Sequence, residues 1–285
     1  MGDGRVVRSA HAKVNLWLNV VGRRADGYHL LDSLVAFVDL ADRVEVAAAD
    51  RLALTVDGPL AGALGTEPDN LVLKAARLLA DRAGVSPRAA IRLSKHVPVA
   101  AGLGGGSADA AAALRALVDL WRVAMPEDEL FDLAARLGAD VPMCLAGRAA
   151  FVSGIGERLA WAPPLPPAAI LLVNPRKALA TRDVFAARTG GYSPERPTTR
   201  GWSSLEDLAG LLAARGNDLL PAARTLEPAV GSVLDRLVAG PARYVGMSGS
   251  GATCFALYET LDRARAAAAT LPGEWWSHAG SFVAG

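Results

Sequence analysis

The start of the chain alternates hydrophobic and polar residues with the two-residue period of a β-strand. Residues 6–22 show this period most clearly and place Val14, Leu16, Leu18 and Val20 on one face. Asp26-Gly27 marks a turn after this strand, and further strands are predicted at residues 30–49, 51–56, 91–99 and 169–175, and as a pair around a glycine-rich turn within 243–258. Both halves of the chain are therefore expected to contribute strands.

A helical period is clear at residues 70–83, where Asn70 is a good N-cap, and at 127–137, which Gly138 follows as a C-cap. Further helices are predicted at residues 107–122, 181–188, 204–214, 227–239 and 261–271. A proline cluster at 163–167 looks like an exposed connection, so we place a domain boundary near residue 160. The pattern predicts an α+β fold with mixed sheets and helices packed on them.

Composition narrows the class of protein. Of 285 residues, 52% are hydrophobic, which excludes a disordered chain. The 30 basic and 29 acidic residues leave a formal charge of +1. The net charge therefore gives no general electrostatic attraction to nucleic acid or to an anionic membrane. Cys144 and Cys254 lie far apart, as expected for two buried, reduced thiols. We expect a cytoplasmic protein without nucleic acid or membrane partners, as a monomer or weak homodimer.

The most informative segment is the glycine-rich loop, residues 98–108, which reads PVAAGLGGGSA. Four glycines between positions 102 and 106 lead to Ser107, the expected N-cap of helix 107–122. Backbone N–H groups at such a helix start bind anions, most often phosphate. The alternative is a flexible lead-in to a helix, but so many glycines cost backbone entropy that a simple turn does not require. The P-loop and the dinucleotide-binding motif do not fit, because Gly106 replaces the P-loop lysine and the glycine spacing is wrong for GxGxxG.

Three segments together resemble the GHMP family of small-molecule kinases, which includes galactokinase, homoserine kinase and mevalonate kinase. They are the strand around Lys13, the loop 98–108, and the later loop GMSGSGATCF at 246–255. The resemblance implies a two-domain kinase, with an N-terminal ATP-binding domain at 1–160 and a C-terminal domain at 161–285 that contributes to substrate binding. It implies ATP and Mg²⁺ as cofactors. Departures from the family pattern, at Ala100, Ala101 and Ala252, remove no reactive group.

The resemblance implies that Lys13 and Asp140 are the catalytic residues, with Asp140 either removing the hydroxyl proton or only orienting the alcohol. From the residues alone, Asp140 is interpreted as an N-cap and Lys13 as a surface residue whose stem lies along the strand. Asp109, in the first turn of the predicted helix, is expected on a solvated face. The residues implied to contact ATP are Asn70, Lys95, Pro98, Val99, Ala100, Ala101, Gly102, Leu103, Gly104, Gly105, Gly106, Ser107 and Ala108. Ser107 is also the candidate contact for Mg²⁺, whose other ligands stay open.

Residues 12–34, 67–79 and 137–157 resemble one branch of the family more narrowly. The substrate of that branch is a cytidine-diphosphate-linked sugar alcohol, phosphorylated on its 2-hydroxyl. The resemblance implies that aromatic and polar side chains surround the cytosine, with Tyr28 and Phe185 stacking and His29 bonding the base edge. The full set of implied substrate contacts is Asn15, Tyr28, His29, Ile155, Gly156, Thr181 and Phe185.

Two questions stay open at this point. The loop 246–251 supports the phosphate loop, closes on substrate, or is only a tight β-turn. The activity is that of the cytidylyl branch, of a homoserine- or mevalonate-type kinase, or of a non-catalytic nucleotide-binding regulator on the same scaffold.

Overall fold

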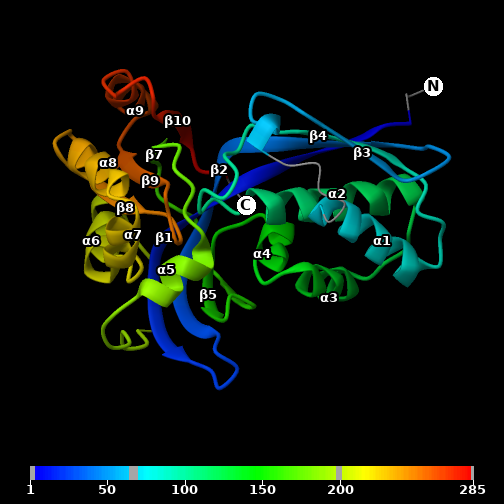
Figure 1. Cartoon of the computed structure of the whole chain (residues 1–285), viewed down its shortest axis with the longest axis horizontal. Helices are drawn as coiled ribbons and strands as arrows, with labels where there is room; N and C mark the ends of the chain where they lie inside the picture. Colours follow the sequence, from blue (N-terminus) through cyan, green and yellow to red (C-terminus); the bar gives the residue numbers. More distant parts are fainter. Residues whose placement is uncertain (1–3, 64–69, 197–200, 284–285) are drawn as a thin grey trace. The chain divides into compact units, whose positions relative to one another are not determined.

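The computed structural model describes residues 4–63, 70–196 and 201–283 (Figure 1). Residues 67–69, part of one segment that resembles the kinase branch, lie outside these ranges. The chain forms two compact units: unit 1 contains residues 1–13, 40–99 and 104–147, and unit 2 contains 14–39, 100–103 and 148–285. Each unit thus combines several chain segments, and the division at residue 160 stays a prediction. The long strands β1 (Val6–Arg23) and β2 (His29–Ala47) contribute to both units.

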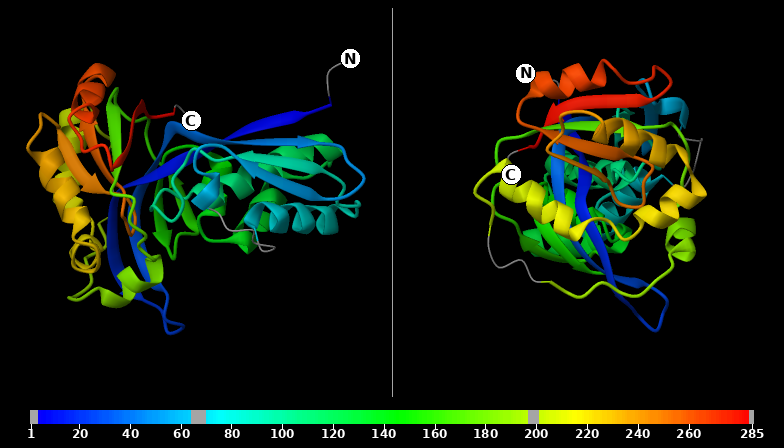
Figure 2. Two further views of the ribbon diagram at one scale, coloured as in Figure 1. Left: turned by 45° about the horizontal axis from the view of Figure 1, so that its top comes forward. Right: turned by 90° about the vertical axis from the view of Figure 1, so that its left-hand side faces the viewer.

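In unit 1, the second half of β2 pairs antiparallel with β4 (Ala90–Ser94), which pairs parallel with β3 (Ala53–Asp57). Helices cover one face of these strands (Figure 2). The helices are η1 (Ala61–Ala63), α1 (Leu71–Ala83), α2 (Gly105–Trp121), α3 (Glu127–Leu137) and α4 (Val141–Ala146). The core lies between them, where Val44, Val46, Ile91 and Leu93 of the sheet meet Leu114 and Leu117 of α2.

Helix α2 begins two residues earlier than the sequence predicts. Its N-cap is Gly104 rather than Ser107, and Ser107 is the third helical residue. Gly104 has a φ of +64°, a left-handed conformation that glycine adopts without a steric cost. The chain can therefore turn into the helix at Gly104, and the N-cap assigned to Ser107 is wrong.

In unit 2, the first half of β2 pairs with β5, and β5 pairs with β6. A second, antiparallel sheet has the order β10-β7-β9-β8. The elements of unit 2 are β5 (Ala150–Gly154), β6 (Arg158–Trp161), β7 (Ala169–Asn174), α5 (Thr181–Ala187), α6 (Leu205–Arg215), α7 (Leu220–Leu226), α8 (Ala229–Val238), β8 (Tyr244–Met247), β9 (Cys254–Tyr258), α9 (Leu261–Ala268) and β10 (Trp276–Ser281). Side chains of α8, such as Val230 and Val233, pack against β7 and β9 in its core.

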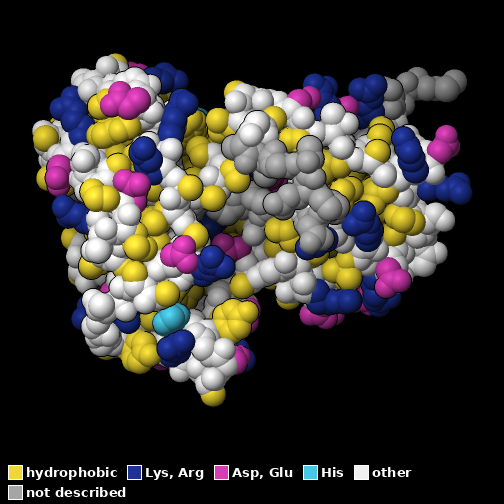
Figure 3. All heavy atoms as spheres, in the orientation of Figure 1, with side chains coloured by type: hydrophobic (Ala, Val, Ile, Leu, Met, Phe, Trp, Pro, Cys, Tyr) yellow, Lys and Arg dark blue, Asp and Glu magenta, His cyan; other side chains and the backbone are white. Residues whose placement is uncertain are grey.

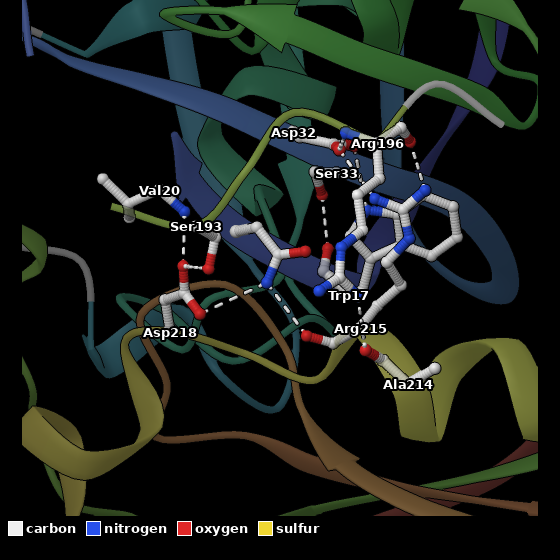
Figure 4. A network of polar contacts seen from close by, with 10 residues as sticks. Trp17, Val20, Asp32, Ser33, Ser193, Arg196, Ala214, Arg215 and Asp218 are labelled. Atoms are coloured by element: carbon white, nitrogen blue, oxygen red, sulfur yellow. Dashed lines mark hydrogen bonds and ion pairs between the residues drawn. The ribbon is translucent and has the colours of Figure 1, made fainter. Parts of the chain in front are cut away.

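Strand β1 is buried on both faces over residues 12–20, although its sequence alternates. The hydrophobic face carries the predicted Val14, Leu16, Leu18 and Val20, and all four are buried. The other face is held by polar contacts in unit 2 (Figure 4): Asp218 accepts the N–H of Val20 and an amide N–H of Asn19. Buried polar groups need such partners, and β1 therefore presents its polar residues at fixed positions.

Among the described residues, no helix is both long and apolar enough to cross a membrane. Cys254 is buried and Cys144 half-buried, and neither is in a disulfide. On the face drawn in Figure 3, basic and acidic side chains are interspersed, which agrees with the formal charge of +1.

Candidate active site

Lys13 and Asp140 form an ion pair in unit 1, with Lys13 Nζ 3.4 Å from Asp140 Oδ2. The side chain of Lys13 is 8% exposed, whereas that of Asp140 is 39% exposed. Asp140 is the N-cap of α4, but its carboxylate makes no capping hydrogen bond. The carboxylate is therefore turned to Lys13 instead of to the helix, as a group that handles a substrate proton requires.

The first turn of α2 lies against the same lysine. A Cβ atom at Gly104 would lie 2.6 Å from Lys13 Cγ, so only glycine leaves space for the lysine stem. The first intrahelical hydrogen bond here runs from Ala108 N–H to Gly104 C=O. The N–H groups of Gly105, Gly106 and Ser107 precede that bond and can point at an anion. The pair predicted to be catalytic and a helix start of the kind that binds phosphate thus meet at Gly104 and Lys13.

Residues 100–103 of the glycine-rich loop belong to unit 2 and are bound there by the loop 246–251. Ser248 Oγ donates to the carbonyl oxygen of Gly102 at 2.9 Å and accepts the Asn15 N–H at 3.1 Å. Thr253 N–H donates to Ala101 C=O at 3.3 Å. Of the three predicted alternatives for the loop 246–251, these contacts favour support of the glycine-rich loop.

The Lys95 side chain is buried in unit 1 between two carboxylates, those of Asp42 and Asp109. The expectation that Asp109 lies on a solvated face is wrong, because this residue is 3% exposed. Burial opposes the charged form of Lys95, but the carboxylates of Asp109 and Asp42 outweigh it and raise the pKa of the ammonium. Burial also raises the pKa of Asp109 to about 7, against the effect of Lys95.

The side chains of two predicted ATP contacts, Asn70 and Lys95, bind other groups of this chain. Asn70 caps α1 as predicted, with Oδ1 accepting Val72 N–H at 2.9 Å. The Lys95 ammonium is enclosed by the two carboxylates. Their contacts with ATP stay predictions.

The residues assigned to cytosine gather in unit 2. The rings of His29 and Phe185 stack with centroids 4.9 Å apart and planes inclined by 24°. Tyr28 is 61% exposed and lies at the hairpin turn before β2. Partial burial, together with the charges of Arg23 and Arg188, lowers the pKa of His29. A neutral histidine both donates and accepts hydrogen bonds, as reading the edge of a base requires.

The remaining predicted substrate residues lie in unit 2 as well. Thr181, at the start of α5, has its hydroxyl 2.9 Å from that of Ser250. Ile155 and Gly156 lie in the turn between β5 and β6, directly after Gly154, which pairs with Leu31 of β2. Their contacts with substrate stay predictions.

Asn15 is buried, and its side-chain amide donates to Ser33 Oγ at 2.8 Å. Its contact with substrate also stays a prediction.

Sequence reasoning missed Asp42. The available signal was weak, because Asp42 is one of three acidic residues in the mainly hydrophobic segment 34–46, with Asp39 and Glu45. A buried acidic residue of this kind needs a basic side chain that pairs with it. Lys95, just after β4 and hydrogen-bonded to Asp57 of β3, is that partner.

Residues 70–148 match the family model described as GHMP kinases N terminal domain, and residues 198–278 match that described as GHMP kinases C terminal. The chain belongs to the GHMP kinase family, whose members are small-molecule kinases that use ATP.

Within the family, the chain is similar to proteins named 4-diphosphocytidyl-2-C-methyl-D-erythritol kinase. The relative from Rhodospirillum rubrum is 50% identical over 282 residues, covering 98% of this chain and 93% of its own. The relative from Paramagnetospirillum magneticum is 54% identical over 271 residues, covering 94% and 95%.

Comparison with solved structures shows similarity to kinases as well. A crystal structure of 4-(cytidine 5'-diphospho)-2C-methyl-D-erythritol kinase aligns with a TM-score of 0.82 at 38% identity, covering 98% of this chain and 100% of that one. Homoserine kinase from Cytophaga hutchinsonii aligns with a TM-score of 0.70 at 19% identity, over 99% and 96%, which shows a shared fold.

Proposed function

We propose that this kinase transfers the γ-phosphoryl group of ATP to the 2-hydroxyl of 4-diphosphocytidyl-2-C-methyl-D-erythritol, a step of non-mevalonate isoprenoid synthesis. Relatives of that name match almost the full length of the chain at about half identity. The observation that carries the proposal is the Lys13–Asp140 pair beside the helix start at Gly104. A non-catalytic regulator does not require an acid–base pair at a phosphate site.

Lys13 and Asp140 have different roles in the proposed phosphoryl transfer. Kinase catalysis depends mainly on positioning and on stabilising charge around a loose phosphoryl transition state. In the transfer, the 2-hydroxyl oxygen bonds to the γ-phosphorus, the bond to the β,γ-bridging oxygen breaks, and ADP leaves. The hydroxyl proton passes to the Asp140 carboxylate. Lys13 holds that carboxylate in place through the ion pair and stabilises the developing negative charge on the attacking oxygen.

Nucleotide and metal fit the helix start of α2. A Cβ at Gly104 would collide with Lys13, so the backbone of the loop, and not side chains, forms the lining. Backbone N–H groups are the donors that phosphate oxygens accept. Mg²⁺ takes one or two protein oxygens and fills its shell with phosphate oxygens and water, and the half-buried Ser107 hydroxyl is the proposed protein ligand. Bound Mg²⁺ neutralises charge on the β- and γ-phosphates.

Substrate recognition is proposed for the cluster of His29, Phe185 and Tyr28 in unit 2. The ring of Phe185 supplies a flat apolar face, and the lowered pKa of His29 keeps its imidazole neutral at physiological pH. Neither group carries a charge that a cytosine would have to match. We further propose a cytoplasmic enzyme acting on a small molecule, in line with its near-zero formal charge.

The test is phosphoryl transfer by the purified protein with ATP and Mg²⁺, followed by ³¹P NMR. A new phosphomonoester on the methylerythritol moiety is expected, with ADP in equal amount. Homoserine and mevalonate are offered in parallel reactions. Transfer to either of these, without transfer to the cytidylyl substrate, overturns the proposal in favour of another branch. Binding of ATP without transfer to any acceptor favours a regulator.

A further inference from the structure

A cluster of three buried charges lies in unit 1 beside the glycine-rich loop: Asp42, Lys95 and Asp109. Lys95 Nζ is 2.7 Å from Asp109 Oδ2 and also pairs with Asp42 Oδ2. None of the three residues is more than 3% exposed. Desolvation of buried charges offsets most of their attraction, so such clusters contribute little net stability. The cluster therefore calls for another explanation than stability.

The Asp42 carboxylate holds the chain just before the loop. Its Oδ1 accepts the N–H groups of His96 and Val97, at 2.5 and 2.8 Å. These two residues directly precede Pro98, where the loop begins. A single carboxylate on β2 thus fixes the entry to the loop.

Lys95 carries this connection to the other end of the loop. Asp109 lies in the second turn of α2, directly after the residues that start the helix. A Cβ at Gly105 would lie 3.5 Å from Lys95 Nζ and 3.3 Å from Val97 Cγ1. The ammonium is therefore packed against the first helical residue of α2, and the entry and exit of the loop are joined through one side chain.

The cluster also leaves one polar atom unsatisfied. Among the described residues, Asp109 Oδ1 is buried and has no hydrogen-bond partner. An unsatisfied buried acceptor destabilises the folded state, because the hydrogen bonds it makes with water in the unfolded chain are not replaced. The cluster of Asp42, Lys95 and Asp109 thus holds its residues in fixed positions although this lowers stability. Such a loss is common where a binding site must be preorganised.

We propose that Asp42, Lys95 and Asp109 are positioning residues that hold the two ends of the glycine-rich loop at the separation that a triphosphate requires. The inference rests on the proposed kinase function and assigns these residues to its nucleotide site. Lys95 acts through the loop and does not touch the nucleotide, since two carboxylates enclose its ammonium. A loop with fixed ends loses less conformational freedom when phosphates bind. The affinity gained in this way grows with the number of phosphates on the nucleotide.

The variant Asp109→Asn tests this inference with little change of shape. It removes one charge and keeps an oxygen that Lys95 can still bond. We expect the affinity for the ATP analogue adenylyl imidodiphosphate, measured by calorimetry, to fall by about 10- to 100-fold. The inhibition constant of adenosine against ATP should stay within about twofold. KM for ATP should rise more than kcat falls, whereas a merely structural defect lowers the active fraction and leaves KM unchanged.

Asp32→Asn is the matched control. It removes a carboxylate charge from another largely buried ion pair, with Arg215 Nη1 2.9 Å from Asp32 Oδ2 in unit 2 (Figure 4). It should lower thermal stability and leave the affinities for the ATP analogue and for adenosine unchanged. If Asp109→Asn does not fold, Asp42→Asn takes its place in the same measurements.

Two results overturn the inference. An equal loss of affinity for adenosine and for the ATP analogue means that Lys95 contacts the base or ribose directly. Unchanged affinity for both means that the cluster is only structural. Failure of the proposed function is seen separately, in the wild-type protein, as absence of transfer to the cytidylyl substrate.

Discussion

The Ser248 hydroxyl donates a 2.9 Å hydrogen bond to the carbonyl oxygen of Gly102, and a Cβ atom at Gly102 would overlap the backbone of Ser248. Gly102 also has a φ of +76°. We expect Gly102→Ala to destabilise the protein by at least about 2 kcal/mol, from left-handed strain and the clash. For a chain of this size the melting temperature should fall by roughly 4–8 °C. Differential scanning calorimetry measures this.

Gly106→Ala is the control for that prediction. Its Cβ would meet only Leu71 Cδ1, at 3.9 Å, an ordinary van der Waals contact. Alanine is the better helix former, so the variant should be as stable as the parent or more stable by about 0.5–1 kcal/mol. Equal melting temperatures for the two alanine variants would contradict the proposed support of the loop by Ser248.

The Lys13–Asp140 pair predicts a separation of turnover from binding. Asp140→Asn removes the proton acceptor but keeps the side-chain shape, so kcat should fall by about 10²–10⁴-fold. Lys13→Met keeps an unbranched stem beside Gly104 and should lower kcat by a similar order. Dissociation constants for the ATP analogue and the cytidylyl substrate, from calorimetry, should change by less than about threefold. Retained turnover in Asp140→Asn would exclude this residue as the base.

Local signals in the sequence predicted most of the helices. Asn70 caps α1 and Gly138 follows α3, because each residue type acts on its immediate neighbours. Strand β10 carries no such signal: its sequence WSHAGS alternates weakly, and it owes its place to antiparallel pairing with the distant β7. Pairing between distant segments depends on the whole fold.

In the candidate site, too, some features follow from the local sequence and others depend on distant residues. The glycine-rich loop could be proposed as a phosphate site from its residue types alone. The Lys13–Asp140 pair was predicted through the family resemblance, because no local pattern connects residues so far apart in the chain. The burial of Asp109 could not be predicted, since it depends on Asp42 and Lys95 meeting beneath α2.

The stacked ring of Phe185 predicts a substrate-specific effect. Phe185→Ala removes the flat face proposed for the cytosine, so KM for the cytidylyl substrate should rise by about tenfold. KM for ATP should not change. Phe131→Ala is the control, because Phe131 is also half-buried but packs in the core of unit 1. Steady-state kinetics with each substrate varied in turn distinguish the two. A rise in both KM values for Phe185→Ala would point to a general loss of structure.

His29 gives a pH dependence whose sign follows from its surroundings. Its pKa is lowered by burial and by Arg23 and Arg188, so the imidazole is neutral near pH 7. Below about pH 6.5 the unfolded chain takes up this proton before the folded protein does, so folding stability should fall with pH until the lowered pKa is passed. KM for the cytidylyl substrate, in contrast, should stay constant as the pH falls to about 6.5. Over that range His29 remains neutral, and only the neutral ring can both donate and accept hydrogen bonds.

Arg188→Gln tests the cause of that shift. Removal of one nearby cation should move the NMR titration midpoint of the His29 ring to a higher pH. Arg182→Gln is the matched change on α5, since the Arg182 side chain is 90% exposed and pairs with Asp183. It should leave the midpoint unchanged, because solvent screens so exposed a charge. If both variants move the midpoint equally, the shift reflects the net charge of α5 and not the proximity of Arg188. In that case the partial burial of the ring and the charge of Arg23 would be left as the local causes of the lowered pKa of His29.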